Sequence, residues 1–437
     1  MLTNKILESS LLLVICFLRF GRADTAIVVE ASDDESKDSI VVEDVPQYGY
    51  PTTPWLPYYF FSPMMQPQYS SVGTSPNKET GICEESGTCT RLGGRASGSC
   101  ANGRVCCINI VTNTCDETDR KVITVDNTYW QSPTTGINSF VSSCGITVKL
   151  DAKLPEQGKA VCQVRFNFVL FTIAQPDTES ACITDTFDVA GASNRVPTIC
   201  GDNEGQHMYL NVPSSSTSPT DLQFSFNFGT NSNPVRAWNI LISMIPCDSA
   251  NLAPMDCLQY FTGRTGTVKS FNWRDVTGTA TRQLANQDYS ICFRTAPGFA
   301  KTLCVTPCTV TSTQKPFSLS VARFVQPPDG NVVQTPDVSQ FLSTNCNNDF
   351  LVIPGAYNTG NPPIETDMTF DRFCGERLNA LPGKGVSTTV CTTATPFRLL
   401  YRTNSDETLT ETIDTDPNVV AVPIDGNRGF CLNFRNQ

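Results

Sequence analysis

The most regular feature of the chain is an alternation of apolar and polar residues that begins at Val161. Every second residue of the following run is apolar: Cys162, Val164, Phe166, Phe168 and Leu170. The first three residues between them are polar: Gln163, Arg165 and Asn167. A period of two places these sets on opposite faces of an extended strand. We therefore expect a half-buried strand whose apolar face packs inward and whose polar face lies in water.

Further segments repeat this alternation. One has Leu222, Phe224, Phe226 and Phe228 on one parity, and another has Trp238, Ile240, Ile242 and Met244. Clusters of Pro, Gly, Ser and Asn at 213–220 and 229–234 separate these segments. The C-terminal run 429–434 again places Phe430, Leu432 and Phe434 on one face. Short alternating strands between turn residues, without a stretch of 3.6-residue period, predict an all-β sandwich.

The first 23 residues have the pattern of a secretory signal peptide. Lys5 precedes an apolar run at 11–18, and Gly21-Arg22-Ala23 supplies a small-residue cleavage site. No later stretch reaches about 20 apolar residues, the length that spans a bilayer. We therefore expect a secreted, extracellular protein without a membrane span. Its 437 residues are enough for two or three domains.

The cysteine content fits this compartment. The chain has 20 cysteines and a single histidine, His207. Cysteine-dense secreted chains are usually disulfide frameworks, and a zinc site is disfavoured because Cys-x-x-Cys pairs are missing. The net charge is −11, with many of the carboxylates in segment 24–44. A nucleic-acid partner is not expected, because phosphate contacts need clustered Lys and Arg.

Two segments precede the alternating strands. Residues 24–79 are first acidic and then rich in proline and aromatics, so we expect an unfolded arm that is either an anchoring segment or a spacer. Residues 80–112 form a small cysteine-rich module of mostly turn residues. So short a module needs disulfides for its stability. Its five cysteines are Cys83, Cys89, Cys100, Cys106 and Cys107.

The cysteine loops resemble those of CUB domains. Cys182-Ile183-Thr184-Asp185 and Cys200-Gly201-Asp202 are similar to the second disulfide loop of that family, and the continuation to Tyr209 is similar to the form in secreted arthropod CUB proteins. Corresponding cysteines recur after Asp256. The resemblance implies two CUB-like jelly-roll sandwiches, at 113–245 and 246–437. We refer to these two ranges as the first and the second sandwich.

The resemblance also implies a disulfide pattern. It pairs Cys115 with Cys144, Cys182 with Cys200, Cys257 with Cys292, and Cys346 with Cys374, and it favours Cys391–Cys431 as a fifth bridge. Related arthropod sequences have a cysteine shortly before the position of Cys162 that is missing here. Cys162 is therefore expected to be a free, buried thiol. The alternative is a disulfide-linked dimer formed through the N-terminal module. Pairing in that module and of Cys247, Cys304 and Cys308 stays open.

No catalytic residue is predicted. A Ser-His-Asp or Cys-His site needs a histidine base, and the single His207 is not beside a nucleophile motif. No Gly-x-Ser-x-Gly motif or Gly-rich phosphate loop occurs. We expect His207 to be a structural or surface residue.

The resemblance yields weak calcium candidates. Many CUB domains hold Ca²⁺ through carboxylates, which here correspond to Asp185 in the first sandwich and to Asp349 and Asp406 in the second. Ala174 stands where the family has a glutamate. The alternative is that these aspartates accept bonds from backbone N–H groups. No other cofactor is expected.

Taken together, these features indicate a secreted, non-enzymatic binding protein. Its CUB-like domains would bind an extracellular protein or glycan. One alternative is a structural component of cuticle, extracellular matrix or eggshell. Another is a non-catalytic regulator of an extracellular protease cascade, which rests on analogy of modules alone.

Overall fold

The computed structural model describes most residues from 79 onward. Described with their side chains are residues 79–113, 115, 121–134, 136–137, 141–150, 159–218, 220–229, 234–277, 282–295, 298, 300–311, 315–319, 346–359, 371–381, 384–405 and 427–437. Strands β1–β4, β21–β23 and β28, and Phe370, are described as backbone only. The chain divides into two units, Met1–Met64 and Met65–Gln437.

The first unit contributes three strands. They are β1 (Val14–Phe20), β2 (Ala23–Val29) and β3 (Glu43–Val45), hydrogen-bonded in that order. The rest of the predicted signal peptide (1–23) and most of the predicted arm (24–79) lie outside the described residues.

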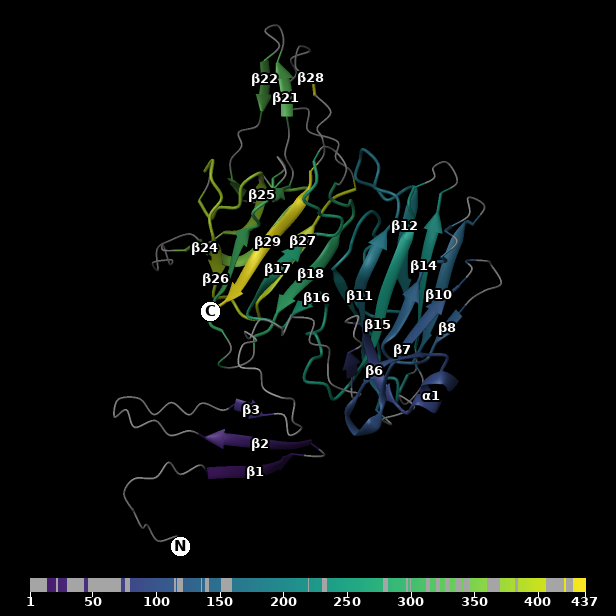
Figure 1. Ribbon diagram of the computed structural model, residues 1–437. Coiled ribbons are helices and arrows are strands. Elements are labelled where there is room, and N and C mark those ends of the chain that lie inside the picture. The colour runs from purple at the N-terminus through teal and green to yellow at the C-terminus, as the bar shows by residue number, and fades with distance from the viewer. Residues whose placement is uncertain are drawn as a thin grey trace, which may run out of the picture. The chain divides into compact units, whose positions relative to one another are not determined.

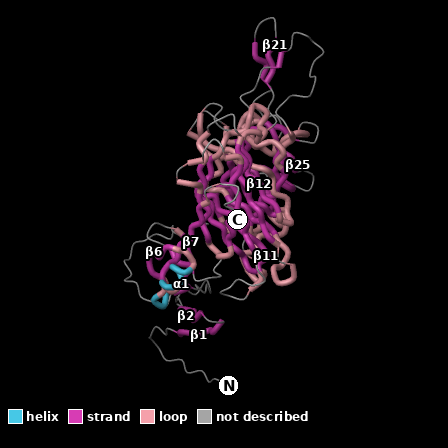
Figure 2. Tube along the Cα trace, turned by 90° about the vertical axis from the view of Figure 1, so that its right-hand side faces the viewer, coloured by secondary structure: helices cyan, strands magenta, loops and turns pink. Residues whose placement is uncertain are grey.

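Strands dominate the second unit. Its described helical turns are α1 (Ser86–Arg91) and the 3₁₀ turn η1 (Ala101–Gly103) (Figure 2). The prediction of a nearly all-β fold with jelly-roll-like sheets is confirmed. Among the described residues, no helix has the length and apolar character needed to cross a membrane.

The first sandwich has two sheets (Figure 1). One contains β12 (Asp185–Ala190), β14 (Asp221–Phe228), β10 (Ser143–Lys149) and β8 (Lys121–Ile123), in that order. The other runs β13 (His207–Asn211), β11 (Val161–Thr172), β15 (Ala237–Pro246), β9 (Thr128–Gln131), β7 (Val105–Thr112), β5 (Thr80–Glu84) and β4 (Val72–Thr74), with β6 (Arg95–Ser99) beside β7. The cysteine-rich module therefore extends the second sheet, because β7 pairs in parallel with β9.

The second sandwich is one continuous ladder of strands. Their order is β16 (Cys257–Phe261), β18 (Asp288–Phe293), β27 (Arg398–Arg402), β24 (Phe350–Asn358), β26 (Val390–Thr392), β19 (Leu303–Pro307), β29 (Gly429–Asn436) and β17 (Thr265–Lys269). Strand β24 joins the two layers, because its first residues pair with β27 and its last with β26. Gly355 lies between these parts with φ +59°, a value that favours glycine.

Smaller strands complete this unit. Strand β20 (Phe317–Ser318) pairs with β29, while β25 (Phe370–Gly375) pairs with β24 and with β23 (Ser339–Phe341). Strands β22 (Asn331–Gln334), β21 (Arg323–Gln326) and β28 (Val420–Ala421) form a separate three-stranded sheet.

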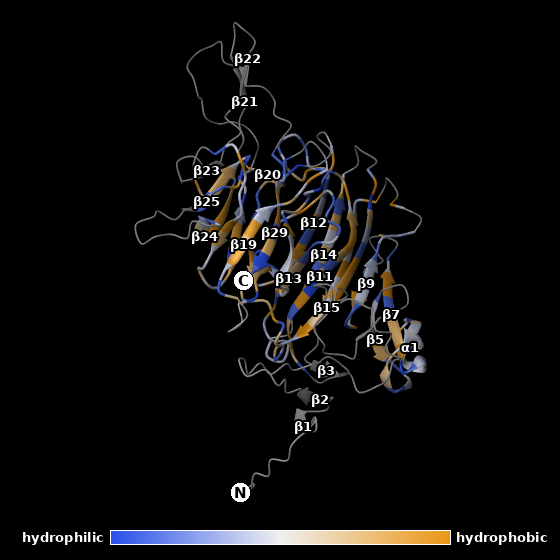
Figure 3. Cartoon of the chain, turned by 60° about the vertical axis from the view of Figure 1, so that its left-hand side comes forward, coloured by the Kyte–Doolittle hydropathy of each residue, from blue (hydrophilic) through white to orange (hydrophobic). Residues whose placement is uncertain are grey.

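Apolar and polar residues alternate along β11 and β14, as Figure 3 shows. On β14 the burial follows the predicted parity. On β11 two expectations are wrong. A bulge between Phe168 and Leu170 shifts the register, so that Leu170 is exposed and Phe171 is buried. Gln163 and Arg165, expected in water, are also buried.

The core of the first sandwich is mostly aromatic. Trp130, Phe226 and Trp238 pack together, and the rings of Phe226 and Trp238 stack with centroids 4.2 Å apart. Phe171 and Phe187 meet edge to face at 5.5 Å. Such pairs add about 0.5–1.5 kcal/mol each to the burial of the rings.

The structure has nine disulfides among the described residues. Four join the pairs that the family resemblance implies: Cys115–Cys144, Cys182–Cys200, Cys257–Cys292 and Cys346–Cys374. The other five are Cys83–Cys100, Cys89–Cys107, Cys162–Cys247, Cys304–Cys391 and Cys308–Cys431.

Two cysteine predictions are therefore wrong. Cys391 and Cys431 are not partners, because β19 lies between β26 and β29. Cys304 of β19 bonds Cys391 of β26, and Cys308, directly after β19, bonds Cys431 of β29. Cys162 is not a free thiol, because the pairing of β11 with the end of β15 brings it to Cys247. Cys106 is the unpaired cysteine of the described residues, and it is buried.

Buried amide side chains hold the two sandwiches together. Gln163 of β11 exchanges two hydrogen bonds of 2.8 Å with the backbone of Ala253. Gln206 donates to the carbonyl of Ser270 and accepts from Gln259. Because a buried polar group without a partner is costly, these bonds fix how the two sandwiches dock.

Asn272 makes the most bonds across this boundary. Its Oδ1 accepts from the Asp202 N–H, and its Nδ2 donates to Gln175 Oε1 and to the Arg282 carbonyl. Its own N–H donates to Asn203 Oδ1. Gly201 is required here, because a Cβ would lie 2.1 Å from Asn272 Oδ1.

We predict that Asn272→Ala lowers the free energy of unfolding by about 2–3 kcal/mol, because it leaves buried donors and acceptors without partners. Chemical denaturation followed by tryptophan fluorescence measures this. The matched control is Asn433→Ala, at an exposed position of β29. This substitution should change the free energy of unfolding by no more than about 0.5 kcal/mol. Equal effects of the two substitutions would contradict the stabilising role of Asn272 at the boundary between the sandwiches.

Candidate functional site

Asp185 and Arg236 form a buried ion pair at one end of the first sandwich. The guanidinium donates from Nη2 to Oδ1 at 2.7 Å and from Nε to Oδ2 at 2.9 Å. The side chains are 0% and 3% exposed, respectively. This is the fork-to-carboxylate geometry in which arginine pairs most strongly.

Backbone donors complete the site. The Gly229 N–H donates to Asp185 Oδ1, and the Ala174 N–H donates to Oδ2. Arg236 also donates to the Gly229 carbonyl and lies 4.7 Å from the centre of the Phe228 ring. The carboxylate thus accepts four hydrogen bonds, which use its lone-pair sites.

Strand registers bring these residues to one place. Asp185 opens β12 opposite Phe228, the last residue of β14. Arg236 comes directly before β15, whose first residue, Ala237, pairs with Thr172 at the end of β11. Four strand ends therefore meet around the ion pair, which joins the loop before β12 to the loop before β15.

The calcium hypothesis does not fit Asp185. Its oxygens are occupied by Arg236 and two backbone N–H groups, so the guanidinium already supplies the positive charge. Asp349 is buried and accepts from Gln283 Nε2 and from the Asn404 N–H. Asp406 lies outside the described residues. No group of three or more potential metal ligands occurs in the described part of the chain.

Exposed apolar residues occur on the segments that lead to the ion pair. Ile183 and Val235 flank it in sequence and are 70% and 74% exposed. The bulge in β11 also turns Val169 and Leu170 outward, close to the same strand end. Single exposed apolar residues are common, whereas several near the same strand ends are a candidate contact surface. We call Val169, Leu170, Ile183 and Val235 the apolar end.

His207 lies between the sandwiches rather than in a reactive site. Its Nε2 accepts a hydrogen bond of 3.1 Å from the Tyr260 N–H of β16. The ring packs edge to face against Tyr209 and Phe261. Burial and the neighbouring Arg165 guanidinium hold the pKa of His207 well below its usual value. The imidazole is therefore neutral and acts as an acceptor.

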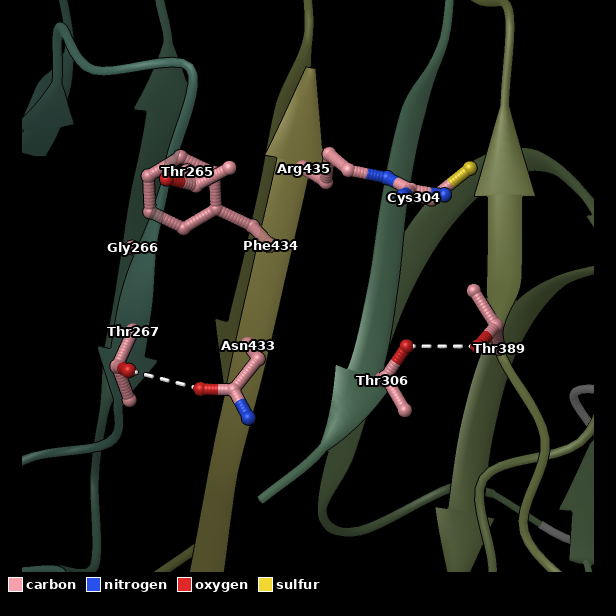
Figure 4. A pocket seen from close by; sticks show the side chains of 9 residues that line it. All are labelled: Thr265, Gly266, Thr267, Cys304, Thr306, Thr389, Asn433, Phe434 and Arg435. Atoms are coloured by element: carbon pink, nitrogen blue, oxygen red, sulfur yellow. Dashed lines mark hydrogen bonds between the residues drawn. The ribbon is translucent and has the colours of Figure 1, made fainter. Parts of the chain in front are cut away.

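The second sandwich carries an open depression of about 560 Å³ (Figure 4). It lies over β17, β29, β19 and β26. Thr267 donates to Asn433 at 2.8 Å, and the hydroxyls of Thr306 and Thr389 bond each other at 2.7 Å. These side chains satisfy one another across the strands, and Cys304 beside them is in its disulfide.

Comparison with protein families identifies part of the chain. The model of the animal CUB domain matches residues 254–437. This segment is similar to animal CUB domains. CUB domains are generally non-catalytic modules of protein interaction, which with the many disulfides supports an extracellular interaction role.

Comparison with curated proteins found no match. Among solved structures, the CUB1-EGF-CUB2 domain of human MASP-1/3 matches with 13% identity and a TM-score of 0.21, over 71% of this chain and 98% of that one. The CUB1-EGF-CUB2 domains of rat MASP-1 match with 15% identity and a TM-score of 0.20, over 75% and 100%. Likeness at this level carries no argument about function.

Sequence reasoning found Asp185 but not its partner. Arg236 is the single basic residue of Pro234-Val235-Arg236-Ala237-Trp238, at the entry to an apolar strand. A buried aspartate needs a counter-charge, and a lone arginine at a strand entry was the available signal. Val169 and Leu170 of the apolar end had no comparable signal, because their exposure depends on the β11 bulge.

We predict that Arg236→Met lowers the free energy of unfolding by about 3–5 kcal/mol, because it leaves the buried Asp185 charge without its partner. The control is Arg195→Met, which breaks the exposed pair with Asp288 and should cost about 1 kcal/mol or less. Denaturant titration of both variants provides the comparison. A loss at Arg236 as small as that at Arg195 would refute the role of this ion pair.

We also predict a pH dependence that arises from His207. Its folded pKa lies below the unfolded value of 6.5, so the unfolded chain binds the extra proton first. The contribution of His207 is fully present above pH 6.5 and is lost as the pH falls below it. Melting temperatures between pH 7.5 and about 5 should fall more steeply for the wild type than for His207→Gln. Parallel curves would show that His207 does not titrate in this way.

Proposed function

We propose that this protein is a secreted, non-enzymatic extracellular binding protein whose apolar end contacts a protein partner. The observation that supports this most is the exposure of Val169, Leu170, Ile183 and Val235 at one end of a sandwich. The CUB domain at 254–437 agrees with an interaction role.

The ion pair explains how the apolar end keeps its shape. Asp185 and Arg236 lie two residues after Ile183 and one after Val235, so both exposed side chains are carried by backbone that the ion pair fixes. A surface that is ordered before binding loses less conformational entropy on association. Because Arg236 supplies the positive charge, we propose that binding does not require calcium at Asp185.

A structural component of cuticle, matrix or eggshell and a regulator of a protease cascade are alternative functions. A soluble binder is recovered freely from extracellular fluid, whereas a matrix component needs a chaotrope. The glycan alternative is distinguished by chemistry, because an apolar contact surface favours a protein over a hydroxyl-rich ligand.

The test uses immobilised wild-type protein to capture its partner from native extracellular fluid, with and without a calcium chelator. The double variant Ile183→Asp/Val235→Asp should lose the captured species, and chelation should not. Met255→Asp is the matched control, because Met255 is 77% exposed and follows the opposite end of β15. Equal capture by both variants would overturn the proposed surface, and calcium dependence would overturn its mechanism.

A further inference from the structure

The cysteine-rich module holds one thiol beside a disulfide. On β7, Cys107 belongs to one face, where it packs with Cys89 and Ile82. Cys106 belongs to the other face, where it packs with Ile108, Tyr129 and Leu241. Neighbouring residues of a strand point to opposite faces, so Cys106 is separated from the Cys89–Cys107 disulfide.

The other disulfide of the module lies on the side of Cys106. Cys83 of β5 is directly opposite Cys106 in the antiparallel pairing with β7. Residues opposite each other in a ladder share a face. Cys83 is bonded to Cys100, and Cys100 packs against the same cluster as Cys106. Three sulfur atoms therefore meet on one face of a small sheet.

We propose that the Cys106 thiol exchanges with the Cys83–Cys100 disulfide, so that Cys100 becomes a thiol that can be modified. The Cys106 thiolate attacks Cys83 Sγ, a Cys83–Cys106 bond forms, and Cys100 leaves as a thiolate that takes up the proton. One disulfide replaces another, so no oxidant or reductant is consumed.

The backbone geometry permits the exchanged bond. Opposed residues of antiparallel strands have Cα atoms about 4.5–5.5 Å apart, within the range of about 4.4–6.8 Å found for disulfides. The same chain already contains such a bond, since Cys304 and Cys391 are directly opposed on β19 and β26 and are joined. The loop closed by Cys83–Cys106 is only slightly longer than that closed by Cys83–Cys100, so chain entropy barely distinguishes the two forms.

The exchange moves the thiol from a buried to an accessible place. Cys106 is fully buried, and burial raises the pKa of its thiol, which keeps it unreactive toward solvent reagents. Cys100 is half-buried and precedes η1, whose residues are all exposed. Its thiolate can attack an external low-molecular-weight disulfide, forming a mixed disulfide on Cys100 and releasing one small thiol.

The test maps the thiol in the native full-length protein. Folded protein is treated with N-ethylmaleimide at pH about 8, where thiolates form, then acid-quenched, denatured and treated with isotopically heavy reagent. Non-reducing digestion and mass spectrometry should find light label on Cys100 together with a Cys83–Cys106 linked peptide. Light label on Cys106, or no light label on Cys100, overturns the proposal.

Two variants separate exchange from simple opening of the module. Cys106→Ser removes the attacking thiol, so light labelling of Cys100 should fall by about tenfold or more. Undiminished labelling would overturn the proposal. Cys100→Ser should form a Cys83–Cys106 disulfide and contain no thiol in the cysteine-rich module after denaturation. Two free thiols there would overturn the geometric argument. The Cys89–Cys107 peptide serves in each sample as the control for a folded module.

Discussion

The arrangement of this molecule depends on satisfying polar groups that are buried between two β-sandwiches. Gln163, Gln206, His207 and Asn272 lie on surfaces that a lone sandwich would expose to water. Each has a partner from the other sandwich, in most cases a backbone group. Amide-to-backbone bonds are directional, so the boundary tolerates little sliding. These hydrogen bonds therefore hold the two sandwiches against each other in one arrangement.

The same principle operates at the end of the first sandwich, with charge added. A buried carboxylate needs a counter-charge, and two solutions are a bound cation or an internal one. Here Arg236 is the internal cation, and it is covalently part of the chain. Asp185 and Arg236, which follow Ile183 and Val235 closely in the sequence, are therefore held in place by the folding of the sandwich itself.

The sequence alone was sufficient to predict the fold class. It was not sufficient to predict the burial of side chains where a bulge or a segment distant in sequence determines that burial. Alternation in β14 predicted burial, because that strand is regular. On β11, the bulge after Phe168 reversed the parity of Leu170. Gln163 and Arg165 were expected in water because the strand pattern does not show that a second sandwich covers them. No periodicity could have revealed that covering layer.

The disulfides and the candidate site also have a part that the sequence predicts and a part that depends on tertiary structure. Pairs close in sequence, such as Cys182–Cys200, could be inferred from spacing and resemblance. Cys162–Cys247 has a sequence separation of 85 and depends on strand order, as do the bonds of Cys304 and Cys308. Asp185 was identified by resemblance, whereas Arg236 is brought to it by tertiary pairing of β11 with β15.

The parallel pairing of β7 with β9 has a mechanical consequence. Both strands run in the same direction, so tension applied to the start of β7 and to the end of β9 acts along the ladder in opposite senses. Such a load shears the four paired positions together instead of opening them one after another. The cysteine-rich module is thus attached in the orientation that resists pulling best, and its disulfides limit how far it can extend. A protein tethered through this module could carry force without losing the fold of its sandwiches.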